Sequence, residues 1–175
     1  MNYVEAGFLF DVPNHVAEVS QSFSFKAVKQ AGSSPICVPL YRNTTRALNL
    51  SCSHLNPSGG QRSVRINGVA LNAAGNAASA CDGTDKTVNL TFDNSGVATP
   101  ALLFADVGNM TLAVNEVVSG TTINGTDTFI TAPKDFAFSG ITAGPLTAAS
   151  PFGATLTARN NLGNATPNFG KETVQ

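Results

Sequence analysis

The fold is decided by an alternating stretch that leads straight into a turn, Thr87-Val88-Asn89-Leu90-Thr91-Phe92-Asp93-Asn94-Ser95-Gly96. Val88, Leu90 and Phe92 alternate with polar residues, which is the pattern of a β-strand that buries one face and exposes the other. The Asp-Asn-Ser-Gly sequence after Phe92 is typical of a turn. The stretch therefore predicts a short, half-buried strand that ends before Asp93.

The same two-residue period recurs on both sides of this stretch. Apolar residues alternate with polar ones in four further segments, residues 22–29, 48–52, 63–66 and 109–114. Turn sequences rich in Gly, Pro, Asn and Asp separate them, at residues 32–35, 56–60, 82–85 and 106–109. No segment carries an apolar stripe of helical period, and Gly75 and several Asn residues favour a loop in the Ala-rich residues 70–80. We expect an all-β fold, an immunoglobulin-like antiparallel β-sandwich with Greek-key connections.

The expected organisation is one complete unit followed by part of another. We expect residues 1–118 to form the immunoglobulin-like sandwich, the Ser/Gly/Thr-rich residues 119–127 a linker, and residues 128–175 the start of a second β unit. A weak internal repeat supports a second unit, because residues 25–32 and 156–163 align without gaps and each reads as a strand that ends in a Gly turn. A unit of fewer than about 50 residues is near the lower limit for independent folding. We therefore expect the second unit to be incomplete, or to dock its strands on the first.

The composition excludes several classes of partner. Charged residues make up 12% of the chain, about half of the ~25% usual in soluble domains, and Ser, Thr, Asn and Gly take their place. The net charge of −1 provides no broad positive field, so we expect neither nucleic-acid binding nor membrane insertion. This make-up is typical of an exported β-protein, yet the first residues lack the basic start and apolar stretch of a signal peptide. We expect an internal piece of a longer exported chain.

Three cysteines leave the disulfide pairing open. Folding the chain back at Asn43-Thr44-Thr45 would place Cys37 opposite Cys52 in neighbouring strands, so a disulfide between these two is possible. Cys81 could instead bond to either of them, and three free thiols remain a further alternative. The cysteines lack a CxxC spacing and the two histidines, His15 and His54, are isolated, so we predict no zinc site and no cofactor.

The candidate catalytic groups give no pattern of an active site. Ser58 follows His54 closely, but its Pro-Ser-Gly-Gly context is a turn and no nucleophile elbow is present. The four glutamates suggest no cleft for glycoside cleavage; they are Glu5, Glu18, Glu116 and Glu172. We therefore predict no catalytic residues and a protein that is not an enzyme.

Calcium is the more serious possibility for a bound metal, because oxygen ligands stiffen many arrays of surface domains. Four aspartates occupy predicted turns, namely Asp82, Asp85, Asp93 and Asp106. Their spacing matches no calcium motif, and an Asp in a turn is explained by the hydrogen bonds that its side chain accepts from the backbone. We predict no metal-binding residues.

Several segments carry a resemblance to a known family. They are Leu90-Thr91-Phe92-Asp93 with Gly96, Phe104–Gly108 leading into Thr111-Leu112, Thr128–Pro133, Phe136–Ile141 and Thr166–Glu172. In this order they resemble the MshQ-like domain of bacterial surface proteins, known from accessory proteins of mannose-sensitive haemagglutinin (MSHA) type IV pili. The resemblance implies an immunoglobulin-like fold in a large exported protein associated with pilus biogenesis or adhesion. It carries over no catalytic residue.

The sequence therefore predicts a structural or interaction segment of a bacterial surface protein. The expected partners are neighbouring domains of the same chain and possible contacts with pilus components or surface polysaccharide. The alternative is a carbohydrate-binding module of an adhesin. Sugar-binding platforms favour Trp and Tyr, but the chain has no Trp and only Tyr3 and Tyr41, while its 11 Phe residues alternate in a way that places most of them in the core.

Overall fold

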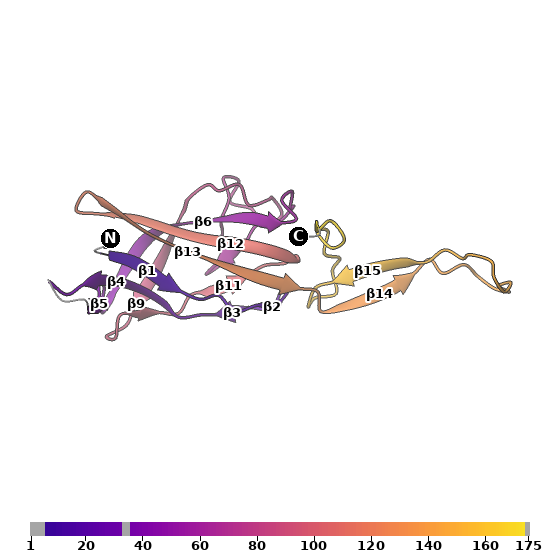
Figure 1. The fold of residues 1–175 in the computed structure, drawn as a ribbon, viewed down its shortest axis with the longest axis horizontal. Helices are drawn as coiled ribbons and strands as arrows, with labels where there is room; N and C mark the ends of the chain where they lie inside the picture. Colours follow the sequence, from indigo (N-terminus) through magenta and orange to yellow (C-terminus); the bar gives the residue numbers. More distant parts are fainter. Residues whose placement is uncertain (1–5, 33–35, 174–175) are drawn as a thin grey trace.

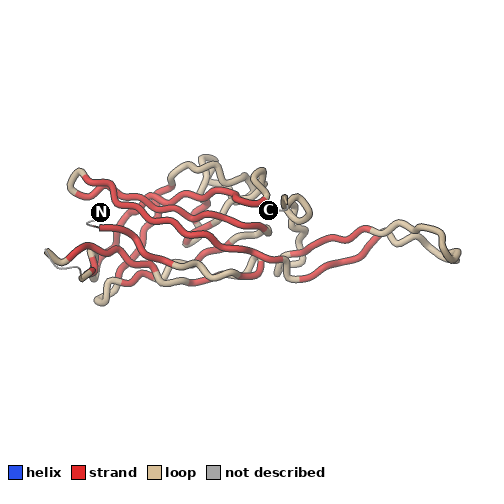
Figure 2. The backbone as a smooth tube through the Cα atoms, in the orientation of Figure 1, coloured by secondary structure: helices blue, strands red, loops and turns tan. Residues whose placement is uncertain are grey.

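The computed structural model describes residues 6–32 and 36–173 and shows a β-sandwich body from which a two-stranded ribbon projects (Figure 1). These described residues form strands and loops without a helix, as the tube view makes clear (Figure 2). None of them forms a helix long and apolar enough to span a membrane. The predicted all-β class is confirmed.

One layer of the body is a five-stranded sheet with the order β2-β13-β12-β6-β9. Its strands are β2 (His15–Val16), β6 (Thr44–Asn56), β9 (Lys86–Phe92), β12 (Gly108–Val118) and β13 (Thr121–Ala132). All neighbours are antiparallel except β2, which runs parallel to the end of β13. The predicted strands at residues 48–52, 88–92 and 110–114 lie within β6, β9 and β12 of this sheet.

The opposite layer consists of two smaller sheets. In the first, β4 (Phe25–Gln30) pairs with β1 (Ala6–Phe10), with β10 (Val97–Ala98) and with β5 (Cys37–Pro39). The second has the order β3-β11-β7-β8, formed by β3 (Gln21–Ser22), β11 (Ala101–Leu103), β7 (Arg65–Ile66) and β8 (Val69–Ala70). Inward-facing residues of both layers form one hydrophobic core, in which the largest fully buried side chains include Phe25, Phe92, Phe104 and Phe129.

The predicted strand at residues 22–29 is broken in the structure. Gln21 and Ser22 pair with β11, whereas Phe25–Lys29 pair with β1 in the other small sheet, where Phe25 and Lys26 also pair with β10. Phe23 and Phe25 are both buried, so the alternation of apolar and polar residues continues across the break. The two-residue period therefore predicts which side chains face the core. It does not predict which strand each residue pairs with.

The predicted linker at residues 119–127 is wrong. Ser119 and Gly120 both have positive φ angles, of 51° and 83°, and form a two-residue turn that is typical of tight β-hairpins. Beyond this turn, Thr121 to Thr131 pair with β12 along its whole length. The first unit therefore extends to Ala132, and the boundaries at residues 118 and 128 both fall inside one hairpin of the five-stranded sheet.

The remainder of the chain leaves the body and returns to it. After Pro133, β14 (Asp135–Ser139) and β15 (Thr155–Arg159) form the projecting ribbon, with residues 140–154 at its tip (Figure 1). Residues 160–173 then fold against the end of the sandwich. This last segment, rather than the strands of the ribbon, is what docks on the first unit.

Candidate functional site

The ribbon presents one apolar face. Its register pairs Phe136 with Ala158 and Phe138 with Leu156, and directly opposed residues of an antiparallel pair lie on the same face. Phe138 is 69% exposed, Leu156 49% and Phe136 47%. The other face carries small or polar residues, such as Ser139 opposite Thr155. Residues 136–158 contain no charged side chain, so this face can interact with a partner only through apolar and neutral polar groups.

Contacts of Arg159 and Phe169 help to hold the base of the ribbon. Arg159 donates a hydrogen bond from Nε to Oδ1 of Asp135 at 2.7 Å, and this hydrogen bond lowers the pKa of the Asp135 carboxyl. Phe136 meets Phe169 edge to face, with ring centroids 5.1 Å apart. The ring of Phe169 thus covers part of the apolar face where the ribbon joins the body.

Asparagine side chains fasten residues 160–173 to the sandwich. Asn160 is buried and donates from Nδ2 to the carbonyl of Ala105, while its Oδ1 accepts the backbone N–H groups of Leu162 and Asn164. Asn168 is fully buried and donates from Nδ2 to the carbonyl of Val107. A buried amide that makes several hydrogen bonds fixes the path of the segment, because any other path would leave those groups unpaired.

Asp106 is the centre of this attachment. Its side chain is fully buried, and Oδ1 accepts the backbone N–H groups of Val107 and Asn168 at 2.9 and 3.1 Å. Burial raises the pKa of the Asp106 carboxyl, although these hydrogen bonds and the nearby Arg62 and His54 act in the opposite direction. The sequence had assigned Asp106 to a turn; the structure shows that it also joins the C-terminal segment to the body.

His54 does not form a catalytic pair with Ser58. The Nε2 atom of His54 lies 2.9 Å from the carbonyl oxygen of Arg62, and its ring packs near Phe104. Burial lowers the pKa of this imidazole. Ser58 is exposed in its turn, and within residues 6–32 and 36–173 no hydrogen bond connects its hydroxyl with His54.

The disulfide joins Cys52 to Cys81, one of the two alternatives that involve Cys81. The pairing of Cys37 with Cys52 is not formed, because β5 pairs with β4 instead of β6 and so carries Cys37 away from Cys52. Cys37 is free and exposed. Cys52 lies in the core, so the disulfide ties the middle of β6 to the loop before β9.

The candidate calcium ligands accept hydrogen bonds from other groups of the protein. Asp82 accepts the N–H groups of Ala73 and Thr84, which lowers its pKa, and Asp93 accepts those of Ser95 and Val97. Asp85 accepts a hydrogen bond from the side chain of Asn115. Among the described residues there is no group of three or more His, Cys, Asp or Glu side chains that could hold a metal ion.

The glutamates are also dispersed. Glu18 binds Arg65 at 2.9 Å, and Glu172 accepts the N–H of Gly170. Glu116 is buried and contacts two partly exposed side chains: it binds Arg46 at 2.5 Å and accepts the hydroxyl of Tyr41 at 2.6 Å. Burial and the hydrogen bond to Glu116 raise the pKa of Tyr41 to about 12. Glu5 lies outside the described residues.

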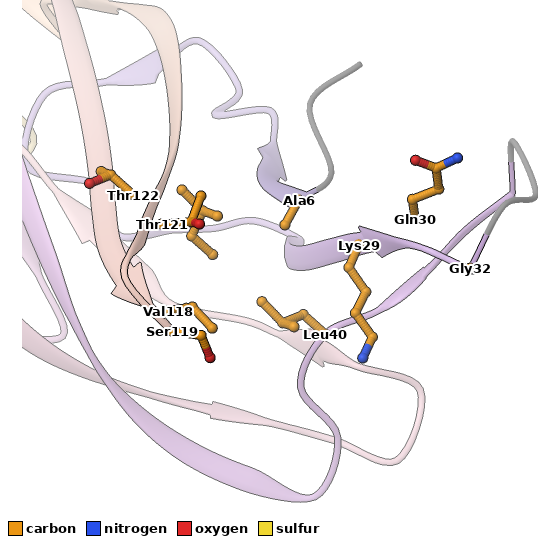
Figure 3. Close-up of a pocket in the computed structure, with 10 residues that line it drawn as sticks. Ala6, Lys29, Gln30, Gly32, Leu40, Val118, Ser119, Thr121 and Thr122 are labelled. Atoms are coloured by element: carbon orange, nitrogen blue, oxygen red, sulfur yellow. The ribbon is translucent and has the colours of Figure 1, made fainter. Parts of the chain in front are cut away.

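A shallow groove, shown in close-up in Figure 3, lies at the end of the body away from the ribbon, where the β12–β13 turn and the end of β4 meet (Figure 1). It measures about 740 Å³, and the turn between β12 and β13 forms one wall while the end of β4 forms another. The side chains shown there are mostly small or apolar, with Lys29 as a cation and Gln30 as an amide (Figure 3). They bring together no combination of acid, base and nucleophile.

Together these features define an immunoglobulin-like β-sandwich that carries a projecting ribbon at one end. Residues 1–126 match the sequence model of a family described as "Domain of unknown function (DUF6701), first Ig-like domain", and the chain belongs to this family. No match to the chain is found among curated proteins or among solved structures.

Proposed function

We propose that this protein is a non-enzymatic structural and interaction segment of a large, exported bacterial surface protein, associated with MSHA-type pilus biogenesis or adhesion. The observation that carries the proposal is the attachment of the projecting ribbon to the sandwich through the buried Asp106, Asn160 and Asn168. This attachment fixes the angle at which the ribbon leaves the sandwich. It therefore sets the orientation of the next unit of the chain relative to this one. The resemblance to MshQ-like domains supports the association with pili.

The mechanism is mechanical. The described N-terminal residues begin near one end of the body, and the ribbon leaves from the other end (Figure 1). Units linked in this manner extend along a line and hold a distal binding module away from the cell. The single core of the body and the disulfide between Cys52 and Cys81 resist unfolding of the spacer outside the cell.

The test deletes or replaces all 175 residues within their gene in the bacterium. The deletion should reduce adhesion or piliation. If the protein acts as a spacer, an unrelated β-sandwich of equal length in its place should restore adhesion or piliation. A replacement that fails while the native segment succeeds would assign the role to specific contacts of this surface. Antibodies that reach the segment only in lysed cells would contradict the proposed location.

A second candidate, a carbohydrate-binding module, is favoured by the outer face of the five-stranded sheet. The outward positions of β6, β9, β12 and β13 carry no Asp, Glu, Lys or Arg. Short polar side chains form rows across the strands, for example Thr128, Thr111 and Ser53. Hydroxyl and amide groups on an uncharged sheet match the hydrogen bonds that a neutral polysaccharide offers.

A glycan array with the purified chain decides this candidate. Binding of a neutral polysaccharide should weaken at least about tenfold in Thr111→Glu, which places a charge in the middle of the polar rows. Ser24→Glu, on an exposed loop that joins β3 to β4, is the matched control and should bind as the unchanged chain does. No reproducible binding to any neutral glycan would remove this candidate.

A further inference from the structure

The apolar face of the ribbon has no layer packed over it along most of its length. Its strands alternate apolar and polar residues as a sheet does when one face packs on a core. Yet Phe136, Phe138 and Leu156 remain about half exposed or more. An isolated two-stranded hairpin is marginally stable in water, because a third strand or a covering layer is needed to bury its apolar face.

The ribbon repeats the pairing of β1 with β4 in the body. In the body, Phe8 pairs with Ala27 and Phe10 pairs with Phe25. In the ribbon, Phe136 pairs with Ala158 and Phe138 pairs with Leu156. Both pairs of strands are antiparallel, and each places a Phe-x-Phe sequence opposite an apolar-x-Ala sequence.

The surroundings of the two strand pairs agree as well. Segments of similar length connect the strands, residues 11–24 in the body and residues 140–154 in the ribbon. The second strand of each pair, β4 or β15, is followed by a glycine with positive φ: Gly32 at 57° and Gly163 at 80°. These correspondences follow the gapless alignment of residues 25–32 with residues 156–163. The ribbon is thus equivalent in register and residue type to the β1–β4 pair.

The layer that covers the β1–β4 pair indicates the layer that should cover the ribbon. Phe25 and Ala27 are fully buried and Phe8 is 5% exposed, because the five-stranded sheet packs over them. We propose that β14 and β15 are the opening strand pair of a second immunoglobulin-like unit, and that their apolar face is the docking site for the larger sheet of that unit in the same polypeptide. The proposal rests on the proposed function only in that units follow one another in a row.

Two further observations favour this occupant. The family description assigns residues 1–126 to a first immunoglobulin-like domain, and the ribbon begins beyond them at Asp135. The charge-free residues 136–158 suit the apolar inner face of a β-sandwich, since charged residues are depleted in such cores.

The test measures amide hydrogen exchange of the ribbon in two polypeptides. In the 175-residue chain, the amides of β14 and β15 should exchange rapidly while those of β6 and β12 are protected. In the full-length product of its gene, exchange of the ribbon should slow at least about 100-fold. Phe138→Ser with Leu156→Ser should abolish this protection, and Ser139→Ala with Thr157→Ala on the opposite face should keep it.

Each other result overturns the proposal. Ribbon amides that stay unprotected in the full-length product, or a gene that encodes no β unit after residue 175, would leave the face without this occupant. Protection that rises with the concentration of the 175-residue chain, and disappears in the Phe138→Ser and Leu156→Ser variant, would identify a second copy instead. Exchange within β6 and β12 reports whether a variant has simply unfolded. None of these results depends on where the protein acts in the cell, so they leave the proposed surface function to its own test.

Discussion

At the scale of single residues, the disulfide joins a strand of the core to a loop at its edge. Cys52 is buried in the core on β6, and its bond to Cys81 closes a segment with a sequence separation of 29. Replacing both cysteines with Ala should lower the free energy of unfolding by about 2–4 kcal/mol, because the unfolded chain gains freedom.

Denaturant unfolding with and without a thiol reductant checks this prediction. Cys37→Ser is the control, and it should unfold like the unchanged protein because Cys37 is exposed and free. Equal stability of the double variant and the control would show that the core alone holds β6 in place.

Asp106 provides a second prediction, on pH. Its pKa is raised by burial, so its contribution to stability is present below the pKa of the unfolded chain and is lost as the pH rises through the folded pKa. Asp106→Asn keeps an oxygen acceptor and removes the titration. The unchanged protein should therefore gain stability relative to Asp106→Asn as the pH falls from 7 toward 4, as measured by urea unfolding across that range.

Asp106→Ala is the companion variant. It leaves the buried N–H groups of Val107 and Asn168 without their acceptor, which should cost about 1–3 kcal/mol at any pH. Residues 160–173 should then exchange their amides faster than in Asp106→Asn. A stability difference between the unchanged protein and Asp106→Asn that does not vary with pH would contradict the assigned titration.

At the scale of elements, the alternation of side chains predicted the central strands but missed β13. Strands β9 and β12 place apolar residues at most of their inward positions, so their pattern is visible in the sequence. In β13, two inward positions are Gly125 and Asp127. Gly125 is required by the close approach of β1, since a Cβ there would lie 2.7 Å from the carbonyl oxygen of Phe8. Asp127 accepts the backbone N–H of Val12 at 2.7 Å. Tertiary contacts thus replaced the apolar residues that would have revealed the strand.

The close approach of Gly125 to the backbone of Phe8 gives a prediction for β13. Gly125→Ala forces β1 and β13 apart and should destabilise the protein by about 1–3 kcal/mol, as overpacking does. Thr126→Ala, the neighbouring residue on the exposed face, should change stability by less than about 0.5 kcal/mol. Thermal unfolding of the two variants tests the pair, and similar melting temperatures would show that the two strands can separate without loss.

The candidate site was likewise predictable only in part. Alternation and the internal repeat predicted β structure after residue 128, and the ribbon agrees with them in kind. The attachment through Asn160 and Asn168 was not predictable, because Asn in a loop also satisfies its own turn. Only the fold brings these amides to Ala105 and Val107. The disulfide pairing depended on topology for the same reason, since it required knowing that β5 pairs with β4.

At the scale of the whole molecule, the sandwich and the C-terminal part are held together by different forces. Apolar side chains from both layers make the core of the body, and Ile123 and Phe129 on β13 belong to it. The C-terminal part is joined to the body mainly by hydrogen bonds of Asn160, Asn168 and Asp106. The body should therefore be the unit that folds, with its end set by the last residue of β13.

Two truncated chains test where this unit ends. Residues 1–132 keep all of β13 and should unfold cooperatively, with a loss of about 1–3 kcal/mol from the contacts of Asn160 and Asn168. Residues 1–126 match the family boundary but lack Asp127 and Phe129, and Phe129 is 1% exposed. Losing a buried Phe alone costs about 3–5 kcal/mol, a large part of the roughly 5–15 kcal/mol that stabilises a typical domain. The shorter chain should therefore be largely unfolded by circular dichroism while the longer one is folded. Cooperative folding of residues 1–126 would instead show that the second half of β13 belongs with the ribbon, and that the sandwich closes without it.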